Sequence, residues 1–353
     1  MKLGLQLGYW AAQPPSDPAK LVPAAEQAGF DAVFAAESWG SDAFTPLAWW
    51  GSSTSSVRLG TSVAQLSART PTACAMHALT LDHLTGGRFV LGLGVSGPQV
   101  VEGWYGRPFA QPLARTREYV SIVRQVLRRA EPVRNDGPHY PLPYTGPGAT
   151  GLGKSLRSIT HPLRADLPIW LGAEGPRNVA LTGEIADGWL SVFYSVRLAG
   201  VFEEWLGEGL ARPGARRERA DFEVAANCQI VITDDPDAER RLLKPSLAHY
   251  IARMGAPNLN FHADLFRRLG YGEAVDRIIA LTVEGRWADA VDAVPDEMVD
   301  EIAIVGDADR VRAEVARREK AGVSMLLVHC RDVAQVQLLA DTLVERPPLV
   351  ADV

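Results

Sequence analysis

The chain has 353 residues, with 36 Lys and Arg against 42 Asp and Glu and an apolar share of 47%, which is ordinary for a soluble globular protein. No stretch approaches the roughly 20 uninterrupted apolar residues of a membrane helix. The opening MKLGLQLGYW lacks the apolar core of a secretory signal. The mildly acidic balance, without a basic run, argues against nucleic-acid or membrane binding. We therefore expect a cytoplasmic protein whose partner is a small molecule.

The three cysteines are far apart, at Cys74, Cys228 and Cys330. Their apolar neighbours predict buried thiols rather than a disulfide framework. No His-x-Glu or Cys-x-x-Cys spacing occurs, so we expect no metal site. The string GLGVSG lacks the glycine spacing of a dinucleotide-binding fingerprint, and that type of site is rejected.

Short β-rich runs bounded by Gly, Asp or Pro recur along the chain. They cover residues 3–8, 31–36, 58–64, 88–94, 167–172, 188–193, 222–233 and 323–329. Segments with helical spacing lie between them, at residues 18–28, 72–84, 113–129, 177–185 and 310–321. Runs such as FVLGLG are continuously apolar, as parallel strands buried on both faces are. Eight strand–helix repeats favour a closed (β/α)8 TIM barrel over an open doubly wound sheet, and we expect residues 1–353 to form one domain.

Two stretches are too long for a simple strand–helix repeat. Residues 131–166 are rich in Pro and Gly and predict an irregular excursion before the fifth strand. Residues 236–300 are mostly helical in pattern, with amphipathic runs such as EAVDRIIALTVEG. Long insertions in compact domains are usually lids, binding loops or oligomer surfaces.

The residues that leave each strand are the candidates for chemistry, because active sites of such barrels lie at the carboxyl ends of the strands. The first five strands end in residues 8–10, 37–39, 62–65, 94–97 and 172–176. Aromatic, small and acidic residues gather there. Aromatic rings supply stacking area and glycines allow close backbone approach, so we expect a slot for a flat heterocycle. Structural capping of the barrel is the alternative for each residue taken singly.

The string LGAEGPRNVALTG predicts a strand, a small-residue turn and a helix whose first position is Pro176. Free backbone N–H groups at such a helix start favour an anionic phosphate. Arg177 and Asn178 would add side-chain donors. An ordinary helix start is the alternative.

Several long strings resemble the luciferase-like monooxygenase superfamily, and within it the oxidoreductases that depend on the deazaflavin coenzyme F420. The resemblance covers nearly the whole chain. It is carried by FDAVFAAESWGSDAFTPLAWW, VRLGTSVAQLSARTPTACAMHALTLDHLTGGRFVLGLGVSG, the WYG of residues 104–106, LARTREYVSIVRQVL and PIWLGAEGPRNVALTGEIADGWL. It implies coenzyme F420 as cofactor, with FMN as the alternative.

The resemblance also implies where the cofactor lies. Glu37 and Ser38 match the acidic–polar pair that lines the ring, and Ser62-Val63 matches a non-prolyl cis peptide under it. An ordinary trans strand is the alternative for Ser62. The cofactor-binding residues implied by the resemblance are Ser62, Val63, Gln65, Gly94, Val95, Ser96, Gly172, Ala173, Glu174, Gly175, Pro176 and Arg177.

The chain departs from the family's sugar-phosphate dehydrogenases at two places. Those enzymes keep a catalytic His where this sequence has Ser38, and an acid where it has Gly97. Oxidation of an alcohol needs a base for the hydroxyl proton. We therefore expect reduction of an activated C=C, C=N or C=O, with a proton from water, Glu37 or a loop residue, rather than sugar-phosphate oxidation.

The remaining candidates complete the predicted site. Catalytic roles are predicted for Glu37, Ser38 and His329, which ends the eighth strand. Substrate contacts are predicted for the aromatic residues Tyr9, Trp39, Trp104 and Tyr105. Lys154 and Arg157, in the glycine-rich excursion, are expected to clamp the anionic tail of the cofactor.

Two other functions stay open at this point. One is an FMN-dependent monooxygenase that uses O2 and reduced flavin from a partner reductase. The other is a non-catalytic, flavin-binding barrel, because a fold alone does not guarantee activity. The apolar helix in AFTPLAWWGSS and the long helical insertion suggest a homodimer.

Overall fold

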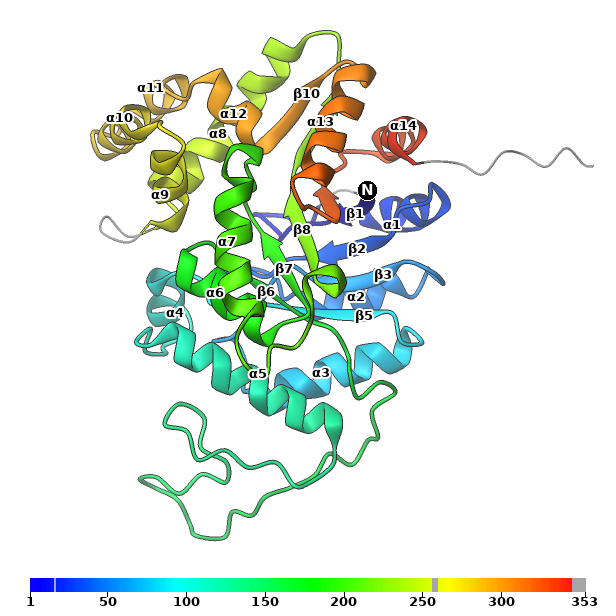
Figure 1. Ribbon diagram of the computed structural model, residues 1–353, viewed down its shortest axis with the longest axis vertical. Helices are drawn as coiled ribbons and strands as arrows, with labels where there is room; N and C mark the ends of the chain where they lie inside the picture. The colour runs from blue at the N-terminus through cyan, green and yellow to red at the C-terminus, as the bar shows by residue number, and fades with distance from the viewer. Residues whose placement is uncertain (16, 256–259, 345–353) are drawn as a thin grey trace, which may run out of the picture.

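The structure, a computed structural model, describes residues 1–15, 17–255 and 260–344. Its centre is a closed ring of parallel strands (Figure 1). The ring runs in the order β3-β2-β1-β11-β8-β7-β6-β5-β4 and closes where β3 pairs with β5. The strands are β1 (Lys2–Gln6), β2 (Ala32–Ala35), β3 (Arg58–Thr61), β4 (Ala64–Gln65), β5 (Phe89–Gly94), β6 (Ile169–Gly172), β7 (Gly188–Ser191), β8 (Glu223–Asn227) and β11 (Met325–Val328).

The predicted (β/α)8 barrel is confirmed, with two differences in detail. The third predicted strand is interrupted after Thr61 and continues as β4. Nine strand segments therefore fill the eight strand positions of the barrel. The seventh predicted strand is two strands, because β8 ends at Asn227 and the chain continues as β9 (Gln229–Ile232). β9 leaves the barrel and pairs in parallel with β10 (Ala303–Gly306), a strand that the sequence analysis did not predict.

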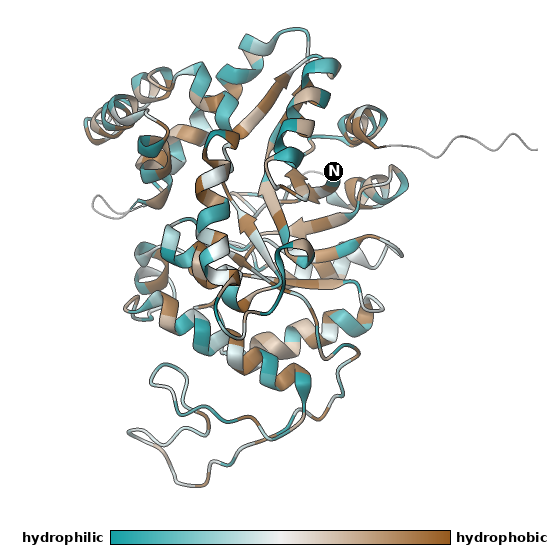
Figure 2. Ribbon diagram, in the orientation of Figure 1, coloured by the Kyte–Doolittle hydropathy of each residue, from teal (hydrophilic) through white to brown (hydrophobic). Residues whose placement is uncertain are grey.

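Side chains from most of the barrel strands fill the barrel interior. They are Ala32, Phe34, Val90, Trp170, Leu190, Ala225, Met325 and Leu327. Phe34 stacks on Trp170 with ring centroids 5.7 Å apart. Below them, Arg58 forms an ion pair with Glu223 and lies over the Trp170 ring. The strands carry buried apolar residues on both faces, and much of their length is brown in Figure 2.

Helices pack around the barrel. They are α1 (Pro18–Gln27), α2 (Phe44–Gly51), α3 (Pro71–Leu84), α4 (Pro98–Gly103), α5 (Pro112–Arg128), α6 (Pro176–Ile185), α7 (Ala199–Leu210), α13 (Ala308–Lys320) and α14 (Val333–Leu343). Short 3-10 turns precede α7 at Val196–Leu198 and β8 at Arg219–Asp221. Seven of these nine helices begin with Pro or with a capping Asp. Proline fixes φ at the first helical position, and the Asp side chain accepts a free backbone N–H.

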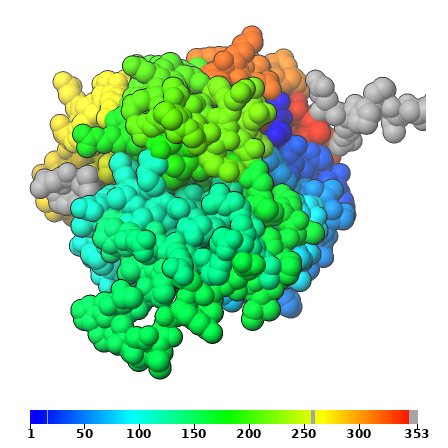
Figure 3. All heavy atoms as spheres, turned by 60° about the horizontal axis from the view of Figure 1, so that its bottom comes forward, coloured from blue at the N-terminus to red at the C-terminus, as the bar shows by residue number. Residues whose placement is uncertain are grey.

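The two long insertions adopt the predicted classes of structure. The excursion at residues 131–166 contains no helix or strand, only an isolated bridge between Asn135 and Leu142. It projects from the body as a separate lobe (Figures 1 and 3). The described residues of the insertion at 236–300 are mostly helical, with α8 (Pro236–Ala252), α9 (Phe261–Arg268), α10 (Gly272–Val283), α11 (Trp287–Asp292) and the start of α12 (Asp296–Ile302).

No helix in the described part of the chain is long and apolar enough to cross a membrane. The described residues also contain no group of three or more His, Cys, Asp or Glu side chains placed to hold a metal ion. All three cysteines are free thiols.

Candidate functional site

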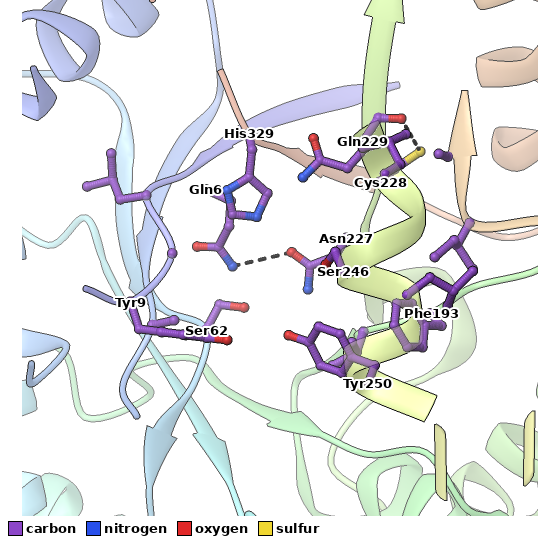
Figure 4. A pocket seen from close by; sticks show the side chains of 18 of the residues that line it. Gln6, Tyr9, Ser62, Phe193, Asn227, Cys228, Gln229, Ser246, Tyr250 and His329 are labelled. Atoms are coloured by element: carbon purple, nitrogen blue, oxygen red, sulfur yellow. Dashed lines mark hydrogen bonds between the residues drawn. The ribbon is translucent and has the colours of Figure 1, made fainter. Parts of the chain in front are cut away.

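The carboxyl ends of several barrel strands open into one cavity of about 440 Å³ (Figure 4). Of the predicted site residues, five line it: Tyr9, Glu37, Ser62, Val63 and His329. The opposite wall is formed by the helical insertion, with Leu243, Ser246, Leu247 and Tyr250 from α8 and Val299 and Ile302 from α12. The cavity therefore lies between the barrel mouth and the helical insertion.

Glu37 is a buried carboxylate that is fully engaged by the protein. Arg69 donates to both of its oxygens, at 2.9 Å and 2.7 Å, and the backbone N–H of Gln65 donates to Oε2 at 2.7 Å. The Gln65 amide donates to the Glu37 carbonyl, and Arg69 stacks on the Phe44 ring. A bidentate Arg–carboxylate pair is among the strongest side-chain contacts. Glu37 is thus arranged as an anionic acceptor and not as a free proton donor.

The Ser62–Val63 peptide is cis, as the family resemblance implied. Val63 packs into the top of the barrel interior. A Cβ added at Gly94 would lie 2.4 Å from Cγ2 of Val63, and one added at Gly172 would lie 3.1 Å from Cγ1. A residue with a side chain at either position would crowd Val63, so packing explains why both positions are glycine.

Three polar side chains on neighbouring strand ends form the floor of the cavity (Figure 4). Gln6 ends β1, Asn227 ends β8 and His329 follows β11, and these strands are adjacent in the order β1-β11-β8. The Gln6 amide donates to Asn227 Oδ1 at 3.3 Å, while Gln6 Oε1 is buried and has no protein partner. Burial lowers the pKa of His329 to about 4, so its imidazole is neutral at pH 7. The sequence analysis named His329 but missed Gln6 and Asn227.

A second polar pair joins the barrel to the helical insertion. His262 of α9 contacts both carboxylate oxygens of Glu174, at 2.8 Å and 3.0 Å. Burial alone would lower the pKa of His262, but the Glu174 carboxylate more than offsets it and the pKa lies above its ordinary value. The His262 ring also packs edge-on against Phe193 and Tyr250. Glu174 was predicted, whereas His262 was missed because its partner lies 88 positions away in the sequence.

Tyr250 links this cluster to the barrel mouth. Its hydroxyl is within hydrogen-bonding reach of Tyr9, and burial is the main reason that its pKa is raised. The Tyr250 phenol therefore stays protonated at neutral pH. Tyr9 is 40% exposed and lines the cavity, in line with its predicted place in the site. No local pattern in the helical insertion marked Tyr250, since only the packing of α8 on the barrel brings it there.

The strand-five end has the predicted strand–turn–helix geometry. Gly175 caps α6, Pro176 is its first residue, and no side chain caps the helix. Arg177 is exposed beside this start, and Ala173 is buried beneath it. Uncapped N–H groups at a helix start favour an anion. The start lies at the same end of the barrel as the cavity.

Other predicted residues lie outside the cavity lining. Trp39 and Trp104 are 49% and 62% exposed. Tyr105 is partly buried, and burial together with the nearby Glu37 charge raises its pKa. The last group, which belongs to the strand ends but does not line the cavity, is Ser38, Gln65, Val95 and Ser96.

The structure does not bring Lys154 and Arg157, the expected tail clamp, to the cavity. Both side chains are exposed in the excursion that joins the end of α5 to the start of β6. In a parallel barrel, helix ends and strand starts lie at the amino-terminal face, opposite the catalytic mouth. The excursion is tied to that face, since His83 at the end of α3 bonds the His161 carbonyl at 2.8 Å. Arg157 contacts Glu131 of the same excursion at 3.7 Å.

Comparison with known proteins identifies relatives along nearly the whole chain. A Mycobacterium tuberculosis protein named "Putative coenzyme F420-dependent oxidoreductase" is 65% identical over 340 residues, covering 96% of this chain and 98% of the relative. The 5,10-methylenetetrahydromethanopterin reductase of Archaeoglobus fulgidus is 28% identical over 309 residues, covering 86% of each chain. The solved coenzyme F420 dependent tetrahydromethanopterin reductase of Methanopyrus kandleri has a TM-score of 0.77 at 25% identity, covering 97% of both chains.

The luciferase-like monooxygenase family matches residues 4–325, from the middle of β1 to the first residue of β11. The closed barrel, the cis peptide at its mouth and the extent of this match agree with one another. The chain belongs to the luciferase-like monooxygenase family.

Proposed function

We propose that this chain is an oxidoreductase that uses coenzyme F420 and reduces an activated C=C, C=N or C=O bond of a small organic molecule. The observation that carries the proposal is the 65% identity, over nearly the full length, to a relative named for coenzyme F420 dependence. The fold shared with an F420-dependent reductase supports it. Coenzyme F420 supplies a hydride from its ring when it is bound in reduced form.

The described residues fit a flat, phosphate-bearing cofactor. Ser62, Val63 and Glu37 offer one wall of the cavity at the barrel mouth, where the ring would lie. The uncapped start of α6 offers N–H groups for a phosphate. One acceptor near these elements, Gln65 Oε1, is buried without a hydrogen-bond partner in the described protein. Such atoms are rare in folded proteins and are suited to donors on a ligand.

The residues of this chain have distinct tasks in the proposed reaction. Glu37 is held by Arg69 and fixes the end of β2 at the cavity wall. The neutral imidazole of His329 can donate one hydrogen bond and accept another at the cavity floor. The helical insertion forms the wall of the cavity opposite the barrel mouth. A proton for the product reaches the substrate from water, because the neutral imidazole of His329 carries no acidic proton.

Reduction is favoured over sugar-phosphate oxidation by the character of the cavity. Ser38 and Gly97 stand where the sugar-phosphate dehydrogenases keep a His and an acid. Of the described residues that line the cavity, none is Lys or Arg, so a phosphate group would find no cationic partner there.

The experiment that tests the proposal is a titration of the purified chain with coenzyme F420 and with FMN, followed by the fluorescence of each. We expect coenzyme F420 to bind at least tenfold more tightly. Tighter FMN binding would instead indicate a flavin-dependent monooxygenase, and binding without turnover over a broad panel of acceptors would indicate a non-catalytic barrel.

A matched pair of variants locates the phosphate-binding end. Arg177→Ala removes a cation beside the start of α6, and we expect it to weaken coenzyme F420 binding about fivefold. Arg157→Ala is the same substitution in the excursion and should leave the affinity within twofold. Equal effects of both variants would contradict the placement of the phosphate at α6.

The homodimer and the cytoplasmic location remain predictions. Trp49 on α2 is 76% exposed, and a large exposed aromatic side chain is typical of an interaction surface. Sedimentation of the wild-type chain and of Trp49→Asp tests whether α2 forms a dimer contact.

A further inference from the structure

The cavity has two chemically different ends. Its floor carries the polar side chains Gln6, Asn227 and His329 at the barrel mouth. Its far end, between α8, α12 and β10, is aliphatic and is lined by Leu243, Leu247, Val299, Ile302 and Ala303. Leu247, Val299 and Ala303 are all at most 5% exposed, so this end is built into the core of the insertion.

The Gln6–Asn227 pair leaves one amide NH2 group and one amide oxygen outside its own contact. Gln6 donates to Asn227 through a single N–H···O bond, so the side-chain NH2 group of Asn227 takes no part in it. Gln6 Oε1 is buried and unpartnered. If both amides are flipped, the pair still offers one donor and one acceptor. A single carbonyl or hydroxyl oxygen matches this arrangement.

The charge of the cavity restricts the rest of the ligand. Glu37 is the one acidic residue among the described lining residues, and Arg69 already neutralises it. Cations close to the far end are also paired, since Lys244 of α8 contacts Asp296 at 2.8 Å. A ligand with a carboxylate or phosphate would leave a buried charge without a partner, which is strongly unfavourable.

We propose that the substrate is uncharged, with a mainly aliphatic or alicyclic body that lies between α8 and α12 and a single carbonyl or hydroxyl oxygen held by Gln6 and Asn227. This inference names the substrate class of the proposed function and rests on it for the reaction, but not for binding. The aliphatic wall supplies affinity by burying apolar surface, at about 25 cal/mol per Å². The amide pair supplies orientation, because it fixes which atom of the ligand faces the barrel mouth.

The test uses two ligands of equal length that differ at one end. 2-Nonanone is uncharged, and 8-oxononanoate carries a carboxylate in place of its terminal methyl group. Calorimetric titration of the full-length chain, first alone and then saturated with coenzyme F420, is expected to show at least tenfold tighter binding of 2-nonanone. Equal or tighter binding of the carboxylate, or no binding of either ligand, would overturn the proposal. If coenzyme F420 does not bind, the proposed function is overturned. The titration of the chain without the cofactor then still tests the proposed substrate class.

Two neighbouring leucines on α8 provide a matched control. Leu243 lines the cavity, whereas Leu242 is 65% exposed and does not. Leu243→Gln is expected to weaken 2-nonanone binding about tenfold, and Leu242→Gln to leave it within twofold. Circular dichroism confirms that both variants are folded. Equal affinities for the two variants would place the ligand elsewhere.

A charge added at the rim tests the electrostatic part of the argument. Ser246 lines the cavity on α8 and is exposed, so Ser246→Arg introduces a cation without burying it. This variant is expected to tighten 8-oxononanoate binding at least fivefold and to change 2-nonanone binding less than threefold. An unchanged affinity for 8-oxononanoate would show that the lack of a cation in the cavity does not explain weak binding of the carboxylate.

Discussion

The two long insertions of this chain differ in what they can do, although both interrupt the same barrel. The insertion at residues 236–300 follows β9, which continues the chain from the carboxyl end of β8, and supplies Leu247, Tyr250 and His262 to the site. The excursion at residues 131–166 follows α5 and lies at the opposite face. The point at which an insertion joins the barrel therefore decides whether it can contribute to catalysis, whatever its composition.

The two insertions also differ in how much of their apolar surface is buried. The helical insertion buries Phe266 and Val275 completely. The excursion leaves Leu152 86% and Ile159 94% exposed to solvent. One insertion has its own core and stabilises the mouth, while the other adds exposed apolar surface to the far face.

The largest expected effect is on the free energy of unfolding, when the same Leu→Ala substitution is made in each insertion. Leu281→Ala removes a side chain that is 6% exposed, and we expect a loss of about 2–4 kcal/mol in the free energy of unfolding. Leu152→Ala removes one that is 86% exposed and should change it by less than about 0.5 kcal/mol. Chemical denaturation followed by circular dichroism measures both. Similar losses would mean that the excursion is packed in solution.

The next effect concerns a histidine under the helical insertion and one in the excursion. The pKa of His329 is lowered to about 4 by burial, below the value of about 6.5 expected in the unfolded chain. Its contribution to stability is therefore fully present above pH 6.5 and is lost as the pH falls toward 4, by up to about 3 kcal/mol. His329→Gln should reduce this loss of stability at acid pH, the acid limb of the profile. Chemical denaturation from pH 4 to 7.5 measures the free energy of unfolding.

The control for this prediction is His161→Gln, because His161 is exposed in the excursion. It should leave the acid limb of the wild-type chain unchanged. An acid limb that survives His329→Gln would assign the loss of stability to other groups.

A smaller effect of opposite sign is expected for His262. Glu174 raises its pKa above the ordinary value, so the ion pair stabilises the fold fully below about pH 6.5, the unfolded pKa, and this stabilisation is lost as the pH rises through the folded pKa. The contribution is on the order of 1 kcal/mol, the scale of a charged hydrogen bond. His262→Gln should remove this alkaline loss, as measured by thermal unfolding between pH 6 and 9. A profile identical to wild type would show that the pair does not titrate in this range.

Part of the site could be predicted because it is encoded by short strings. Glu37, Ser62, Val63 and His329 each follow a recognisable apolar strand, and in a parallel barrel all such positions meet at one face. The start of α6 is equally local, since a glycine, a proline and an apolar helix are consecutive in the sequence. The cis peptide was expected from the family resemblance and not from any property of Ser62 itself.

The rest depended on contacts between distant residues. Arg69 reaches Glu37 across 32 positions, and Gln6 reaches Asn227 across 221. The misplaced Lys154 and Arg157 show the same limit, because a basic residue in a glycine-rich loop has the composition of a phosphate clamp at either face of the barrel.

The sequence by itself determined the barrel, its order of strands and helices, and the residues at the strand ends, because hydrophobic periodicity and chain-breaking residues act over a few positions. Only the tertiary structure decided which insertion covers the mouth, that β9 and β10 pair outside the barrel, and that Tyr250 and His262 join the site. The physical reason is that these features come from packing between segments far apart in the chain, where each side chain gains its partner only after the barrel has closed.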